Sequence, residues 1–103
     1  MIKVSVYYPN TPGSTFDMDY YINTHMNICR DQLGPALKGV QVEEGLGGAA
    51  PGAPAPYVAI GHLLFDSVDA FSTAFAPAAA AIQGDIPNYT NVAPTIQVSL
   101  IRM

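Results

Sequence analysis

The stretch Ile2-Lys3-Val4-Ser5-Val6-Tyr7-Tyr8 near the start of the chain alternates between apolar and polar side chains. Every second position from Ile2 to Tyr8 falls on one side of an extended backbone, whereas Lys3, Ser5 and Tyr7 fall on the other. An apolar period of two with β-branched residues predicts a strand that buries one face. We therefore expect a sheet that is covered on one side by helices.

The rest of the chain predicts two helices and three more strands. Apolar side chains recur at helical spacing over residues 16–33, and a second helix begins at Asp66 or Ser67 and ends before Gly84. Pro77 is expected to kink or divide this second helix. Strands are predicted over residues 38–46, 57–65 and 95–101. The order β-α-β-β-α-β indicates one α+β domain over residues 1–103, a ferredoxin-like four-stranded antiparallel sheet with both helices on one face.

The composition predicts a partner for the uncovered face of this sheet. Half of the 103 residues are apolar and only 12% are charged. A domain of this size has a modest core, and oligomerisation is a common remedy. The uncovered face carries Ser5, Tyr7, Gln97 and Ser99 among apolar neighbours. We therefore expect a homodimer in which two sheets press together as a dimeric α+β barrel.

The charge and cysteine content exclude several classes of partner. The net charge is −4, and the four fixed cations Lys3, Arg30, Lys38 and Arg102 are scattered along the chain. Nucleic acids and anionic membranes need clustered cations, so neither is an expected partner. Cys29 is alone, which rules out an internal disulfide and a cysteine cage for a metal. No segment has the features of a signal peptide or a membrane span, so a cytoplasmic location is expected.

The first predicted helix turns a histidine toward the sheet. At about 100° per residue, His25 lies on one apolar stripe, which comprises Met18, Tyr21, Ile22, His25, Ile28, Cys29 and Gln32. A buried imidazole needs a partner for at least one nitrogen, and it can exchange a proton near neutral pH. Two interpretations stay open: His25 is an acid–base group at a cavity, or it is a core histidine that a backbone carbonyl or a tyrosine satisfies.

The other candidate residues give weaker signals. Tyr21 lies one turn before His25 and is a wall residue of either the core or a pocket. His62 with His25 lacks a third ligand at a recognisable spacing, so neither a metal nor a cofactor is expected. Cys29 is interpreted as a small buried hydrophobe rather than a nucleophile. A small apolar cavity between the first helix and the sheet is the expected site, and it suits a small hydrophobic organic ligand.

Two segments resemble the signatures of the EthD family. The first is Phe16-Asp17-Met18-Asp19-Tyr20-Tyr21-Ile22-Asn23-Thr24-His25-Met26, in which an aromatic residue, a Tyr pair and a His share the first helix. The second is Asp85-Ile86-Pro87-Asn88-Tyr89-Thr90-Asn91, followed by Pro94. With the strand order, the resemblance covers essentially the whole chain. The family is named after a protein encoded with an ethyl tert-butyl ether degradation system, and it belongs to the dimeric α+β barrel superfamily.

The resemblance implies the fold, but it leaves the chemistry open. Members of the superfamily include cofactor-free monooxygenases, isomerases, dehydratases and haem-degrading enzymes, because one fold hosts many reactions. One hypothesis is a cofactor-independent enzyme of a degradative or secondary pathway, an oxidoreductase or an isomerase or lyase, with His25 and Tyr21 as catalytic residues. The alternative is a non-catalytic accessory or ligand-binding protein of an ether-degradation system. The expected ligand-binding residues are Tyr7, Met18, Ile28, His62, Asp85 and Tyr89.

Overall fold

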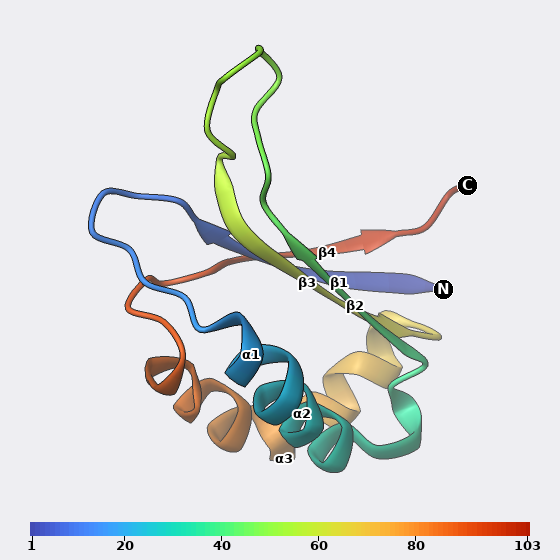
Figure 1. Cartoon of the computed structure of the whole chain (residues 1–103). Helices are drawn as coiled ribbons and strands as arrows, with labels where there is room; N and C mark the ends of the chain where they lie inside the picture. The colour runs from blue at the N-terminus through green and yellow to red at the C-terminus, as the bar shows by residue number, and fades with distance from the viewer.

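A computed structural model describes residues 1–103 and contains one antiparallel sheet whose helices all lie on one face (Figure 1). The strands are β1 (Ile2–Pro9), β2 (Gly39–Glu44), β3 (Tyr57–Phe65) and β4 (Thr95–Leu100). The helices are α1 (Met18–Tyr20), α2 (Met26–Leu33) and α3 (Val68–Gly84), and a π-helical turn, Tyr21–His25, joins α1 to α2. Short 3₁₀ turns cover Gly34–Ala36 and Ile86–Asn88. The predicted ferredoxin-like α+β fold is confirmed.

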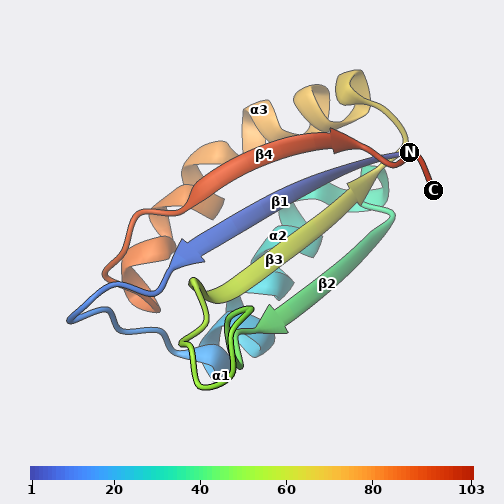
Figure 2. The same ribbon diagram turned by 90° about the horizontal axis from the view of Figure 1, so that it is seen from above.

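The strand order β2-β3-β1-β4 places β1 and β3 at the centre of the sheet, as Figure 2 shows from above. Val4 of β1 lies opposite Leu63 of β3 and Val98 of β4. The predicted alternation along β1 holds in the structure. Ile2, Val4 and Tyr8 belong to the buried core beneath the helices. Intervening residues of β1 therefore face the side of the sheet that no helix covers.

The first helix begins at Met18, two residues later than predicted. The Asp17 side chain caps it by accepting the Tyr20 N–H at 3.0 Å. Within the helix, the Met26 N–H donates to the Tyr21 carbonyl, five residues back, which widens one turn. Ile22 is 46% exposed and does not share the buried stripe, contrary to the prediction. The wide turn changes the angular spacing that an ideal helix would have.

The second helix runs unbroken from Val68 to Gly84, so the predicted division at Pro77 is wrong. Ser67 caps the helix by accepting the Ala70 N–H at 3.1 Å. Pro77 and Thr73 are both exposed. Pro77 has no N–H to donate to the Thr73 carbonyl. Because this carbonyl lies at the surface, water can hydrogen-bond to it, which lowers the cost of a proline inside the helix. No helix in the structure has the length and apolar character needed to cross a membrane.

Candidate functional site

His25 and Asp85 form a buried pair between the first helix and the segment after α3. His25 Nδ1 lies 2.9 Å from Asp85 Oδ2, and the exposed fractions of the two side chains are 5% and 8%. An ionised carboxylate only accepts hydrogen bonds, so the proton of the neutral imidazole resides on Nδ1. His25 Nε2 is then an unprotonated acceptor. This arrangement suits a general base whose ring orientation is set by a carboxylate.

The surroundings keep the imidazole neutral and the carboxylate charged. Burial lowers the pKa of His25 from its ordinary value of 6.5, and this effect outweighs the stabilising influence of Asp85 on the protonated ring. Burial acts to raise the pKa of Asp85, but hydrogen bonds from Tyr20, Asn88 and His25 overcome it and lower the pKa. Near neutral pH the pair is therefore an aspartate and a neutral histidine that is ready to take up a proton.

Two further donors fix the position of the Asp85 carboxylate. Its Oδ1 accepts the Tyr20 hydroxyl at 2.6 Å and the Asn88 side-chain amide at 2.9 Å. Asp85 itself lies at the end of α3, and the 3₁₀ turn Ile86–Asn88 follows directly. The carboxylate is thus held by Tyr20 and His25 of the first helical segment and by Asn88 of the turn that follows Asp85. Such outer contacts orient the histidine, in the same way that supporting residues orient a metal-binding histidine.

Tyr89 connects His25 to the central strand. The Tyr89 hydroxyl lies 3.5 Å from His25 Nε2, longer than an ordinary hydrogen bond, and 2.7 Å from the Tyr8 hydroxyl of β1. Burial raises the pKa of Tyr8 and of Tyr89, so both hydroxyls stay protonated at physiological pH. A chain of polar groups therefore runs from Tyr8 through Tyr89 and His25 to Asp85.

A small apolar cavity of about 100 Å³ lies between the helices and the sheet. Its polar lining groups come from Tyr8, Tyr21, His25 and Gln83, and the remaining lining side chains are mainly apolar. Ile96 at the rim is 51% exposed, so the cavity approaches the surface beside edge strand β4. The volume corresponds to roughly three waters at ~30 Å³ each, and a cavity of ~150 Å³ can hold benzene. A ligand of about four to six heavy atoms matches this size.

Tyr21 forms one wall of the cavity. Its ring lies nearly parallel to that of His25, with 12° between the planes and 5.4 Å between the centroids. Its hydroxyl approaches Gly61 of β3 so closely that a Cβ at position 61 would collide with it. Gly61 therefore provides the space that the phenol occupies. The π-helical turn begins at Tyr21 and ends at His25, and such turns occur frequently at functional sites.

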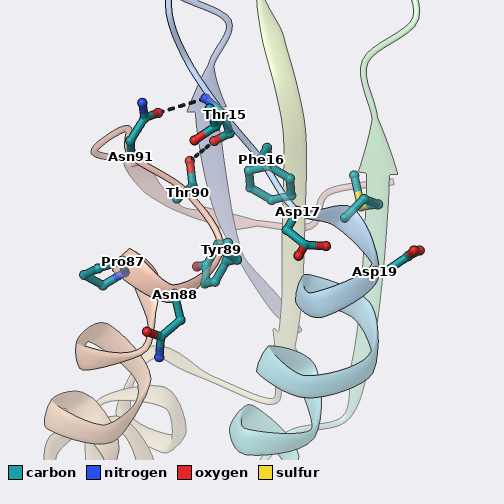
Figure 3. A pocket seen from close by; sticks show the side chains of 10 residues that line it. Thr15, Phe16, Asp17, Asp19, Pro87, Asn88, Tyr89, Thr90 and Asn91 are labelled. Carbon is teal, nitrogen blue, oxygen red and sulfur yellow. Dashed lines mark hydrogen bonds between the residues drawn. The ribbon is translucent and has the colours of Figure 1, made fainter.

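A second, open hollow of about 630 Å³ separates the two segments that resemble family signatures (Figure 3). Hydrogen bonds join these segments along one side. The Asp17 N–H donates to the Tyr89 carbonyl at 2.8 Å, and the Thr90 hydroxyl donates to the Thr15 carbonyl at 2.7 Å. The lining is polar and shallow, with Asp17, Asn88 and Asn91 at its surface. The contacts hold Tyr89 and Asp85 against the first helix.

The structure brings together some of the predicted site residues and separates others. His25, Tyr21, Asp85 and Tyr89 meet beside the cavity. Met18 lines the open hollow, and Ile28 is half-buried but does not line the cavity.

Tyr7 and His62 lie on the face of the sheet opposite to the cavity. Tyr7 packs against Tyr57, with ring centroids 5.1 Å apart. His62 is 2.9 Å from Ser5 Oγ through Nδ1 and 2.9 Å from Glu43 Oε1 through Nε2. Both of its nitrogens are therefore engaged within the sheet. Cys29 lines the cavity and is buried, and burial raises the pKa of its thiol to about 11, which fits the interpretation as a small hydrophobe.

Sequence reasoning did not single out Tyr8, Tyr20 or Asn88. Tyr8 is recognisable only as an inward residue of an alternating strand, and a buried tyrosine there requires a hydroxyl partner. Tyr20 and Asn88 belong to the two signature-like segments, but their common partner Asp85 becomes evident only in three dimensions. No group of three His, Cys, Asp or Glu side chains is arranged to hold a metal ion.

The fold and the site together define a ferredoxin-like α+β protein with a buried histidine–aspartate pair beside a small apolar cavity. The family model of the EthD domain matches residues 14–93. An EthD-like protein from Ralstonia eutropha JMP134 is 43% identical, with 99% of this chain and 92% of that chain covered and a TM-score of 0.94. The chain therefore belongs to the EthD family.

More distant structures share the fold alone. An ethyl tert-butyl ether degradation (EthD) family protein from Bacillus halodurans C-125 is 18% identical, with 98% of each chain covered and a TM-score of 0.74. A dimeric ferredoxin-like protein of unknown function from Thermobifida fusca YX is 16% identical, with 97% of this chain and 89% of that chain covered and a TM-score of 0.56. No functionally curated protein matches the chain in sequence.

Proposed function

We propose that this EthD-family protein binds and converts a small hydrophobic organic molecule by acid–base chemistry, with His25 as the base. The observation that carries the proposal is the buried His25–Asp85 pair at 2.9 Å, whose histidine lines an apolar cavity. Desolvation lowers the pKa of the imidazole, and the carboxylate directs its free nitrogen away from Asp85. A histidine that lines an apolar cavity and is oriented by a buried carboxylate behind it is a strong candidate for a reaction site.

The class of reaction follows from the groups that the cavity offers. A neutral imidazole takes up a proton, and its Asp85 partner stabilises the imidazolium that results. The phenols of Tyr8, Tyr21 and Tyr89 remain protonated because burial raises their pKa values, so they act as hydrogen-bond donors. Proton transfer of the isomerase or lyase type is therefore the chemistry that these residues supply.

Binding of small probes to the cavity tests the proposal. Benzene, acetone and cyclopentanone, titrated into the isotope-labelled protein, are expected to shift the NMR signals of the Met26 methyl group and the Gly61 amide, because both residues line the cavity. Signals of the exposed segment 45–56 are the internal reference. Binding without conversion of any bound compound favours the accessory role in a degradation system. If no probe shifts these signals up to its solubility limit, the proposed site is wrong.

We also propose that the protein works as a homodimer. Large apolar side chains stay exposed in the single chain. Three of them lie on edge strand β4, where Ile96 is 51% exposed, Val98 43% and Leu100 61%. The uncovered sheet face adds half-buried Val58, Ile60 and Leu64. The distant relative from Thermobifida fusca is dimeric. Sedimentation is expected to give twice the chain mass of 10.9 kDa at micromolar concentration. A stable monomer would contradict this expectation.

A further inference from the structure

The Tyr21 hydroxyl is a hydrogen-bond donor beside the cavity. Tyr21 is only 1% exposed, and its hydroxyl shares a hydrogen bond with the hydroxyl of Tyr8. The Tyr8 hydroxyl also bonds to that of Tyr89 at 2.7 Å, so it keeps a partner when Tyr21 turns away. Tyr8 and Tyr21 both line the cavity. A ligand with an acceptor atom can therefore accept the Tyr21 hydrogen bond in place of Tyr8.

The polar groups around this hydroxyl restrict the ligand. Desolvation raises the pKa of Tyr21 strongly, so the phenol donates a hydrogen bond and does not ionise. His25 also lines the cavity, with its ring stacked on that of Tyr21, and its unprotonated Nε2 has only the long 3.5 Å contact with the Tyr89 hydroxyl. No lysine, arginine or carboxylate lines the cavity. The cavity therefore matches an uncharged molecule that carries one acceptor oxygen and, next to it, a proton that a base can remove.

We infer that the substrate class is a small ketone or aldehyde, whose carbonyl oxygen accepts the Tyr21 hydroxyl while His25 Nε2 exchanges a proton with the carbon beside the carbonyl. This inference rests on the proposed acid–base function and names its substrate class. Tyr21 is then a catalytic residue, because it touches the oxygen on which charge develops. About four to six heavy atoms fit, which includes acetone and cyclopentanone.

The reaction balances without any other reagent. The C–H bond next to the carbonyl breaks, and its proton forms a bond to His25 Nε2. The electron pair moves onto the carbonyl oxygen, which becomes an enolate that the Tyr21 hydroxyl stabilises. Asp85 stabilises the imidazolium through Nδ1–H. The imidazolium then returns a proton to the same carbon or to a conjugated one, so the products are an exchanged ketone or an isomer.

Deuterium exchange tests this inference directly. The wild-type protein in D₂O is incubated with acetone or cyclopentanone, and loss of the α-proton signal is followed by NMR. The expected rate exceeds that of an equal concentration of imidazole. Tyr21→Phe is expected to reduce the rate on the order of 10²–10³-fold, as loss of one oxyanion donor does. Because Tyr8 keeps its hydrogen bond to Tyr89, Tyr21→Phe is expected to stay folded and to change the melting temperature little. Tyr57→Phe, at the rim of the sheet and away from the cavity, is the matched control.

The outcomes separate this inference from the proposed function. Wild-type exchange that is lost in Tyr21→Phe at unchanged stability supports the inference. Equal exchange in wild type and Tyr21→Phe overturns it, and so does ketone binding without exchange above the imidazole rate. If benzene still binds the cavity in that case, the proposed site stands and only the carbonyl substrate class falls. If no probe of either kind binds, the proposed function falls with it.

Discussion

Replacing His25 by phenylalanine is expected to abolish conversion of a bound substrate while the chain still folds. Phenylalanine keeps most of the bulk of the ring and removes both nitrogens. General-base catalysis by a positioned side chain contributes about 10²–10⁴-fold, so a loss of that size is expected. The lost hydrogen bond to Asp85 is expected to cost roughly 1–3 kcal/mol of unfolding free energy. Rates measured on the ketone probe, with circular dichroism and thermal melts, separate the two effects.

A comparison with His25→Gln makes the test sharper. Glutamine can donate to Asp85 through its amide, so it restores part of the stability, but its amide cannot accept a proton near neutral pH. Both variants are therefore expected to be inactive, and the glutamine variant is expected to be the more stable. Full activity in either variant would exclude His25 as the base. Unfolding of both variants, with no ligand bound by the wild type, would identify His25 as a core hydrogen-bonding residue.

Because of His25, both the activity and the stability of the protein are expected to rise with pH. The pKa of His25 in the folded protein lies below the 6.5 of the unfolded chain, so between these values the unfolded chain binds more protons. Stability should therefore rise with pH through this interval and level off above about 6.5. The activity should rise as the folded histidine loses its proton. Tyr8, Tyr21, Tyr89 and Asp85 face the ring, and none of them titrates in this interval, because the phenol pKa values are raised and that of Asp85 is lowered.

Local patterns predict those parts of the fold that depend on one segment at a time. A nearly continuous apolar run predicts strand 57–65 with the bounds that the structure has, and the alternation over residues 2–8 correctly turns Tyr8 toward the helices. Helical periodicity places Tyr21 and His25 on the buried side, but it fails at Ile22 because a π-helical turn changes the spacing. A single wide turn leaves no clear mark on an apolar pattern.

The contacts that define the candidate site are less predictable because they join distant segments. His25 and Asp85 are 60 positions apart, and Tyr8 and Tyr89 are 81 apart. Composition and spacing carry no information on which carboxylate will meet which imidazole. The link between Ser5 and His62 likewise depends on the register of β1 against β3, which pairs these two residues directly. A one-residue shift in that register would turn His62 toward the helices.

Replacing Asp85 by alanine is expected to give the largest loss of stability of any single change at the site. The carboxylate accepts hydrogen bonds from Tyr20, Asn88 and His25, and all three donors would lose their acceptor at once. Removing one member of a buried pair while its partners remain is strongly destabilising, and we expect a loss of about 2–4 kcal/mol. For a chain of this size the melting temperature should fall on the order of 10–30 °C. Asp31→Ala, at an exposed position of α2, is the matched control and should melt like the wild type.

Asp85→Asn separates the stabilising role of this residue from its role in directing the His25 proton. The asparagine oxygen can still accept from Tyr20 and Asn88, so much of the stability should return. Its amide group then donates to His25 Nδ1, which forces the imidazole proton onto Nε2 and removes the free base. A swapped tautomer of this kind can lower a rate on the order of 10⁴-fold in a Ser-His-Asp site. We therefore expect Asp85→Asn to be folded but nearly inactive, with ¹⁵N NMR of the histidine ring showing the changed tautomer. An asparagine variant that is as active as the wild type would mean that Asp85 acts only on stability.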